Sequence, residues 1–356
     1  MSEHYSDGMG GHPGAPSLFT PAEALDLVRD EFDLGLADPR VTLSVLAVDV
    51  TERTPELSAL EALATGLPCV TVGVAPDPSW VPGGFDVLLC QGSTVPRPWV
   101  GCDDLERSLV DLGVSIDRSP LASVALVQLL RMGEELSLRD AVVAESFVYS
   151  MLQGGPEFRT WLESRRTSNR AQNGETDPVL VTRHGPFLDI ELHRPEVHNA
   201  LNSAMRDALI TALQLVQVDP TIEAARLRGS GPDFCSGGDL NEFGSATDPA
   251  TAHSVRVSRS AGLALARCAD RVRVEVHGAC VGAGIEIPAF SHRISATPEA
   301  TFTLPEVGFG LIPGAGGTAS LPRRIGRQRT AFAALSGSAV SAHTARQWGL
   351  VDELRA

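Results

Sequence analysis

The chain has 356 residues, 43% of them hydrophobic, and a formal net charge of −15. This length allows one large or two ordinary domains, and the apolar content is enough for a packed core. The acidic balance argues against a nucleic-acid-binding surface and would repel an anionic membrane face. The sequence holds no lysine, so a lysine Schiff base is excluded, and any phosphate must be met by arginine, histidine or backbone amides.

Residues 1–19 are rich in glycine, histidine and proline, which predicts a disordered tail. A helix with proline at its first position is predicted from Thr20. Strands are then predicted at Val41–Val50, Pro68–Val74 and Phe85–Cys90, with a helix at Pro55–Thr65 between the first two. This order is typical of an α/β layer with buried strands.

Three helices follow in the next part of the chain. They are predicted to begin at Ser119, Ser137 and Pro156, and the last ends at Arg166. The polar stretch 167–177 is predicted to be a linker. From 178 onward strands and helices alternate again, which predicts parallel pairing with right-handed crossovers. We therefore expect one domain over 20–166 and a second over 178–356.

The cysteines and the N-terminus exclude several classes of protein. Six cysteines are scattered without a C-x-x-C spacing, so the sequence predicts neither a zinc site nor a disulfide framework, but buried thiols in a reducing compartment. The N-terminus does not resemble a signal peptide, and no apolar run is long enough to cross a bilayer. We expect a cytoplasmic protein with no metal site and no membrane or nucleic-acid partner.

Two glycine-rich turns in the second half each lie beside a glutamate. Gly282–Gly284 precede Glu286, and Glu306 precedes I-P-G-A-G-G-T. Glycine lets the backbone turn tightly and approach a ligand closely. The apolar stretch Ile285–Phe290 can open a helix, so amides near Ala283 would point outward and favour a developing negative charge. The pattern predicts an acid–base site with an oxyanion donor between two carboxylates.

Four motifs occur in order along this half: H-R-P-E-V-H-N-A-L at 193–201, D-F-C-S-G-G-D-L at 233–240, V-H-G-A-C-V-G-A-G-I-E at 276–286 and L-P-E-V-G-F-G-L-I-P-G-A-G-G-T at 304–318. In this order and spacing they closely resemble the crotonase family, the enoyl-CoA hydratases and isomerases. The resemblance covers about half of the chain. It implies an α/β fold, a spiral of strand–strand–helix repeats that binds an acyl-CoA thioester.

The resemblance implies catalytic roles for four residues. The amides of Gly238 and Ala283 would hold the thioester oxygen as it becomes an enolate. Glu286 and Glu306 would hold the water that adds across the double bond, as general acid and base. Isomerase members usually keep only the second glutamate, so the presence of both favours hydration.

The resemblance also implies a groove for the CoA part of the substrate, and no separate cofactor. Two loops would line this groove through Val197, His198, Asn199, Ala200, Ser236, Gly237, Asp239 and Leu240. Asp239 is also interpreted as a helix cap. A homo-oligomer, trimer or hexamer, is implied by the family. An isomerase, another enolate-forming enzyme and a non-catalytic acyl-CoA-binding scaffold stay open as alternatives.

The chain departs from the family at both ends. It lacks the long helical region that usually follows the spiral, covers the active site and supports assembly. The three helices before the linker resemble that region, and the strands before them resemble a degenerate spiral without the motifs. We predict a catalytically silent first half, a helical segment that docks on the second spiral, and a catalytic spiral. Arg323, Arg324, Arg327 and Arg329 are interpreted as a solvated surface, and Cys280 as a packing residue.

Overall fold

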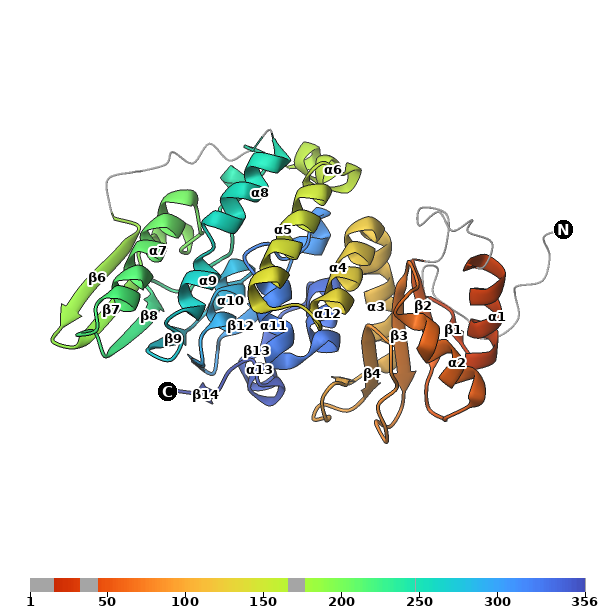
Figure 1. Cartoon of the computed structure of the whole chain (residues 1–356). Coiled ribbons are helices and arrows are strands. Elements are labelled where there is room, and N and C mark those ends of the chain that lie inside the picture. Colours follow the sequence, from red (N-terminus) through yellow and green to blue (C-terminus); the bar gives the residue numbers. More distant parts are fainter. Residues whose placement is uncertain (1–15, 33–43, 166–176, 247, 356) are drawn as a thin grey trace.

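The structure is a computed structural model that describes residues 16–32, 44–165, 177–246 and 248–355. Two α/β parts lie at opposite ends of the molecule, with a layer of helices between them (Figure 1). Most of the predicted tail and linker lies outside the described residues. Leu18–Phe19 form strand β1 by pairing with Ala47 and Val48, so the predicted tail is wrong at these two residues.

The N-terminal part is built on a five-stranded parallel sheet whose strands follow the order of the chain. They are β1, β2 (Val45–Asp49), β3 (Val70–Ala75), β4 (Val87–Gln91) and β5 (Val100–Cys102). The three predicted strands are confirmed, whereas β1 and β5 are too short to give a sequence pattern. Side chains alternate between the two faces, as a pleated strand requires: Val45 and Ala47 join one apolar core, Leu46 and Val48 the other.

Helices cover both faces of this sheet. Helices α1 (Pro21–Phe32) and α2 (Pro55–Ala64) belong to the outer core, and the side chain of Thr54 caps α2 by accepting from Leu57 N. Helix α3 (Leu105–Arg118), which was not predicted, lies on the inner face. The three predicted helices are confirmed as α4 (Pro120–Gly133), α5 (Leu138–Gln153) and α6 (Pro156–Ser164).

The C-terminal part holds a six-stranded sheet of order β14-β11-β9-β8-β7-β6 and a small sheet of order β10-β12-β13. The large sheet is parallel except for the β6–β7 hairpin. Its strands are β6 (Val179–His184), β7 (Phe187–Leu192), β8 (Ala224–Gly229), β9 (Val272–Val276), β11 (Arg293–Ala296) and β14 (Glu353–Leu354). The small sheet comprises β10 (Ala279–Val281), β12 (Thr301–Thr303) and β13 (Val340–Ser341). The predicted parallel α/β architecture is confirmed.

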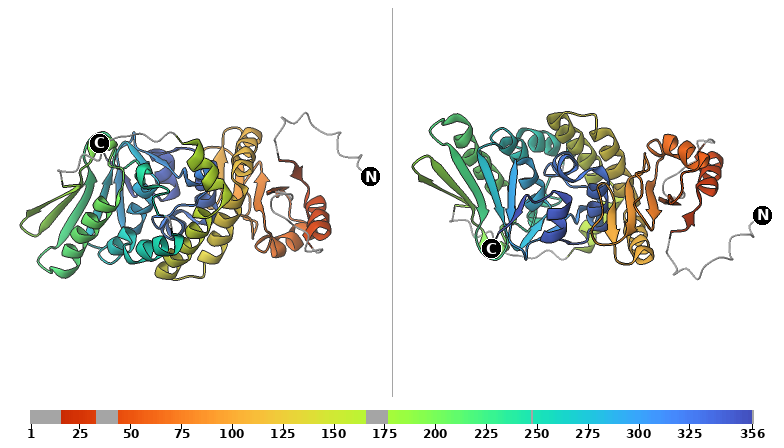
Figure 2. Two further views of the ribbon diagram at one scale, coloured as in Figure 1. Left: turned by 90° about the horizontal axis from the view of Figure 1, so that it is seen from above. Right: turned by 90° about the horizontal axis from the view of Figure 1, so that it is seen from below.

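Helices of this part surround its sheets: α7 (Ser203–Val218), α8 (Pro249–Ser258), α9 (Ala261–Ala266), α10 (Ala283–Glu286), α11 (Gly317–Ile325), α12 (Arg327–Ser336) and α13 (Ala342–Trp348). The two further views in Figure 2 show α4 and α5 between the two parts. Helix α4 packs on α11 and α12, and α5 packs on α8 and α11. One apolar core therefore runs from the inner face of the N-terminal sheet into the C-terminal part.

A buried ion cluster ties the two parts together. Asp86, after the turn that leads into β4, is only 1% exposed. Its carboxylate accepts from Arg131 Nε of α4 at 2.9 Å, from Arg327 Nη1 of α12 at 3.2 Å and from Thr71 N at 2.9 Å. The cluster thus joins a strand, an N-terminal helix and a C-terminal helix.

Arg329 makes a second link, because its guanidinium donates to the carbonyl oxygens of Val95 and Trp99, each at 3.0 Å. The interpretation of Arg323, Arg324, Arg327 and Arg329 as a solvated surface is therefore wrong for Arg327 and Arg329, which are both buried. Four arginines close together in sequence are typical of an exposed surface. Which of them are buried depends on how the two parts of the chain pack against each other. All six cysteines are buried, as predicted. Within the described ranges, no helix is long and apolar enough to span a membrane.

Candidate active site

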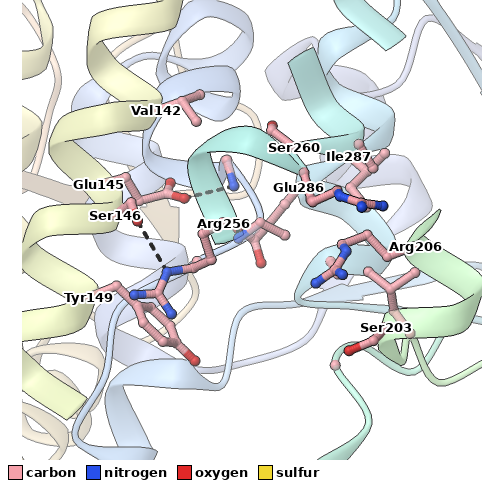
Figure 3. Close-up of a pocket in the computed structure, with 18 of the residues that line it drawn as sticks. Val142, Glu145, Ser146, Tyr149, Ser203, Arg206, Arg256, Ser260, Glu286 and Ile287 are labelled. Carbon is pink, nitrogen blue, oxygen red and sulfur yellow. Dashed lines mark hydrogen bonds between the residues drawn. The ribbon is translucent and has the colours of Figure 1, made fainter. Parts of the chain in front are cut away.

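A cavity of about 230 Å³ lies where helix α5 meets the C-terminal part. Its walls come from α5, α7, α8, α10 and the loop before α11 (Figure 3). A second hollow of about 520 Å³ shares several of these residues, including Tyr149, Arg206, Gly238 and Arg256. The two hollows therefore form one continuous space that is lined by both halves of the chain.

Glu286 is the last residue of the four-residue helix α10 and is only 2% exposed. Its Oε2 accepts hydrogen bonds from Ala315 N at 2.7 Å and Gly317 N at 2.8 Å. Both donors belong to the glycine-rich loop before α11, where short residues allow the backbone to come close to the carboxylate. The loop thus holds Glu286 in one orientation, and its Oε1 has no hydrogen-bond partner in the part of the chain that the structure describes.

Glu306 opens the short helix Glu306–Phe309 and is 8% exposed. Its Oε2 has no hydrogen-bond partner among the described residues. A Cβ placed on Gly282 would lie 2.3 Å from Glu306 Oε1 and 3.7 Å from Glu286 Oε1, so both carboxylates face this one glycine. The predicted pair of acids is therefore brought together around a small space that only a residue without a side chain leaves open.

A third carboxylate, from Glu145 of helix α5, lies on the far side of the same loop and is 2% exposed. It accepts from Gly316 N at 2.8 Å, Thr318 N at 2.9 Å and Thr318 Oγ1 at 2.7 Å. Four consecutive amides thus alternate between Glu286 and Glu145. Sequence reasoning missed Glu145, although it lies on the buried face of α5 beside Ala141 and Val142. A glutamate on an otherwise apolar helix face is the sequence feature that could have indicated a buried functional acid here.

Burial changes the proton affinity of all three acids, because a charged carboxylate is poorly solvated there. Burial raises the pKa of Glu286 to about 7, opposed by the amides of Ala315 and Gly317. Burial and the charge of Glu286 raise the pKa of Glu145 to about 8. The same two causes raise the pKa of Glu306 well above its ordinary value. The charge of Glu286 thus favours the protonated forms of Glu145 and Glu306, and Glu286 is the acid that ionises near neutral pH.

Two backbone amides are available as donors at this cavity. Gly238 and Ala283 both line it, and neither amide donates to any acceptor among the described residues. The amides beside them are in use, since Asp239 N donates to Leu201 O and Gly282 N donates to Thr303 O, each at 2.9 Å. The two predicted positions are therefore donors that the fold leaves free, next to a pair of carboxylates.

Helix α6 supports the turn that carries Glu306. Trp161 packs on Phe309 with ring centroids 4.7 Å apart, and on Phe243 at 5.9 Å. A Cβ on Gly310, whose φ is +72°, would lie 2.5 Å from the backbone nitrogen of Phe158. The N-terminal half therefore contacts the cavity through α5 and the Glu306 turn through α6.

The residues predicted to bind CoA lie on two neighbouring loops, joined by a bond of 2.9 Å from Ser236 N to His198 O. Asp239 lines the larger hollow, and the other seven line neither hollow. The seven are Val197, His198, Asn199, Ala200, Ser236, Gly237 and Leu240. A CoA groove along these loops stays a prediction.

Asn199 holds the loops together from inside. It is fully buried, with Oδ1 accepting from Arg194 N at 2.8 Å and Nδ2 donating to the carbonyl oxygens of Ser230 and Asp233. Its side chain is therefore not available to a ligand, contrary to a direct binding role. Asp239 accepts from Asn241 N at 3.1 Å, which confirms it as a cap.

Other side chains near the turns have structural partners. His277 Nε2 lies 3.0 Å from Gly231 O. Cys280 is buried, and burial raises the pKa of its thiol far above its ordinary value, so it is a packing residue as predicted. Among the described residues no group of three or more His, Cys, Asp or Glu side chains is arranged to hold a metal ion.

Residues 183–356 match the family described as enoyl-CoA hydratase/isomerase. The 2,3-dehydroadipyl-CoA hydratase of Escherichia coli is 33% identical over 176 residues, which are 49% of this chain and 68% of that protein. The 1,2-epoxyphenylacetyl-CoA isomerase of Escherichia coli is 35% identical over 168 residues, 46% of this chain and 64% of that protein. A solved enoyl-CoA hydratase of Mycobacterium smegmatis is 30% identical, covers 51% of this chain and 71% of its own, and gives a TM-score of 0.48.

The chain belongs to the enoyl-CoA hydratase/isomerase family. The resemblance inferred from the four motifs is thereby confirmed, and its boundary agrees with the start of the C-terminal part at β6.

Proposed function

We propose that this protein adds water across the 2,3 double bond of an enoyl-CoA thioester. The observation that carries the proposal is the arrangement around Gly282. Two buried carboxylates with raised pKa, Glu286 and Glu306, face one point beside two free amides. The family's hydratases and isomerases both act on thioesters, and the presence of both acids favours hydration.

The thioester oxygen accepts hydrogen bonds from Gly238 N and Ala283 N. These donors stabilise the negative charge that develops there when C3 is attacked. Glu286 is assigned the base, because two loop amides stabilise its anion. It takes a proton from water as the oxygen bonds to C3. Glu306 has no donor at Oε2 and stays protonated, so it gives its proton to C2 as the enolate collapses.

Glu145 is a positioning residue in this scheme. It holds alternate amides of the loop whose other amides bind Glu286. It also adds a third acid, which keeps a proton near the reacting pair and limits the negative charge of the cavity. CoA enters as part of the substrate, and the reaction needs no cofactor of its own.

The test is turnover of crotonyl-CoA, followed by the loss of the conjugated thioester absorbance. Glu286→Gln and Glu306→Gln should each lower kcat by about 10²–10⁴-fold, the usual contribution of one general acid or base. Glu299→Gln, at an exposed position, is the control and should match the wild type.

Three results would count against hydration. Wild-type protein that moves the double bond of a 3-enoyl-CoA without adding water would indicate an isomerase, and Glu286→Gln should then keep that activity. Another enolate product would point to a different reaction of the same site. Thioester binding without turnover would favour the scaffold.

A further inference from the structure

Helix α8 carries an arginine into the wall of the cavity. Arg256 lies over the ring of Tyr149, with its guanidinium carbon 4.5 Å from the ring centroid. Both residues line both hollows. Figure 3 shows Arg256 and Tyr149 on the α5 side of the cavity, with Ser203 and Arg206 on the opposite side.

Among the residues that the structure describes, the hydrogen-bond partners of the Arg256 guanidinium are all neutral. Its Nε donates to Ser146 Oγ at 3.2 Å, its Nη1 to Gln153 Oε1 at 3.1 Å, and its Nη2 to Ser150 Oγ. A guanidinium has five N–H donors. One N–H on each terminal nitrogen therefore has no acceptor among the described residues.

The neighbouring arginines differ in this respect. Arg206 Nη2 and Arg259 Nη1 each pair with Asp207 at 3.0 Å. Arg256 makes no ion pair with a carboxylate of the described residues, although it is partly buried and burial lowers its pKa. After burial and Tyr149, the charge of Glu145 also acts on the pKa of Arg256 and raises it, but the loop amides and Thr318 already bind that carboxylate. A partly desolvated guanidinium without a counter-ion favours a ligand that carries an anionic group.

The direction of the acyl chain follows from the two amides. The loop 197–200, predicted for CoA, leads into Leu201 and Ser203, which both line the cavity. Ser203 lies across the cavity from Tyr149 of α5 (Figure 3). A thioester with its oxygen on Gly238 and Ala283 thus has CoA on that side. Its C2 and C3 would then lie at the paired acids, and its acyl end would continue toward Arg256 on the α5 side of the cavity.

We propose that the acyl chain of the substrate ends in a carboxylate, which the two free N–H groups of Arg256 bind. This inference rests on the proposed function, because it takes the cavity to be an acyl-CoA site. A carboxylate fits a guanidinium fork with two parallel hydrogen bonds, and the ring of Tyr149 holds the fork in one plane.

Binding of non-reacting thioesters tests the proposal without depending on turnover. Hexanoyl-CoA and its analogue with a carboxylate at carbon 6 differ only at the end of the chain. Calorimetry should give tighter binding of the carboxylate form to wild type. Arg256→Gln should weaken its binding about 10–100-fold and leave hexanoyl-CoA within about 3-fold, as expected for loss of charge-assisted hydrogen bonds.

Arg256→Lys keeps the positive charge but loses the guanidinium fork. Its affinity for the carboxylate thioester should lie between those of wild type and Arg256→Gln. Arg267→Gln, at an exposed position outside both hollows, is the control and should bind both thioesters as wild type does. Circular dichroism and unchanged hexanoyl-CoA binding establish that each variant is folded.

Equal binding of the two thioesters by wild type would overturn the proposal. Equal weakening of both by Arg256→Gln would overturn it too, because Arg256 would then contact a CoA phosphate. A carboxylate preference in a protein that hydrates neither crotonyl-CoA nor the 2,3-unsaturated form of the carboxylate thioester would uphold Arg256 and reject the proposed reaction. No binding of either thioester would reject both.

Discussion

The two halves of the chain contribute to one cavity by different means. The C-terminal half supplies the free amides of Gly238 and Ala283 and the acids Glu286 and Glu306, all from tight turns or short helices. The N-terminal half supplies side chains from one long helix, Leu138–Gln153. A turn that carries catalytic groups needs particular residues at a fixed spacing. A helix that packs beside the site needs only one face of complementary shape. The first kind of contribution leaves a local pattern and the second does not.

Expressing the C-terminal half alone should have the largest effect on activity, because it removes the whole contribution of the N-terminal half. Residues 178–356 alone would expose the apolar surface that α4 and α5 cover, and would lose one wall of the cavity. We expect no measurable hydration of crotonyl-CoA and aggregation in size-exclusion chromatography. A soluble fragment with the activity of the full chain would show that the N-terminal helices are not needed.

Asp86→Ala attacks the contact between the halves rather than the site. It leaves Arg131 buried without a carboxylate and Arg327 with only that of Glu134, and such a loss typically costs about 3–5 kcal/mol. Urea denaturation should report this loss. Asp111→Ala removes an exposed pair with Arg107 and should change stability by less than about 1 kcal/mol. Equal effects of the two variants would mean that the buried cluster does not hold the halves together.

Gly282→Ala tests the turn-based contribution of the C-terminal half. The new Cβ would meet Glu306 Oε1 at 2.3 Å, and φ at this residue is +49°, so the acid must move. A displacement of about 1 Å at a reacting group can lower kcat roughly 100-fold. Gly308→Ala, on the same short helix as Glu306, meets nothing within 4 Å and serves as the control. Unchanged kcat in Gly282→Ala would contradict the assigned position of the acids.

Glu145→Gln tests the helix-based contribution through the pH dependence of stability. The pKa of this carboxyl is about 8 in the folded chain and 4.5 in its ordinary state. Between these values the folded protein binds a proton that the unfolded chain has lost. The free energy of unfolding therefore falls as pH rises through this window.

The variant lacks this group, so its stability should fall less between about pH 5 and pH 8.5, by at least ~1.4 kcal/mol, the equivalent of one pKa unit. Thermal and urea unfolding at several pH values measure the difference. Glu299→Gln, at an exposed position, should keep the wild-type slope. A Glu145→Gln slope equal to that of wild type would show that this carboxyl is not protonated in the fold.

Much of the fold could be predicted from the sequence, because buried strands and capped helices have local patterns. The strands predicted at Pro68–Val74 and Phe85–Cys90 agree with β3 and β4 to within two residues at each end. The paired acids could be predicted because glycine turns place them. Glu145 and Arg256 were missed, because their places at the cavity follow from the packing of α5 against α8 and α11, although a glutamate on the apolar face of α5 was a usable signal. For the same reason the covering of Arg327 and Arg329 was missed.

The number of residues in the loop from Ala315 to Thr318 is fixed by its hydrogen bonds. Its amides meet Glu286, Glu145, Glu286 and Glu145 in turn. Inserting or deleting a single residue there would exchange the partners, so that the amides that fix the proposed base would turn toward the opposite carboxylate. The loop therefore works as a register between two parts of one chain, much as a one-residue slip reverses the faces of a strand. This alternation constrains the length of the loop, just as close contacts with neighbouring side chains constrain its glycines.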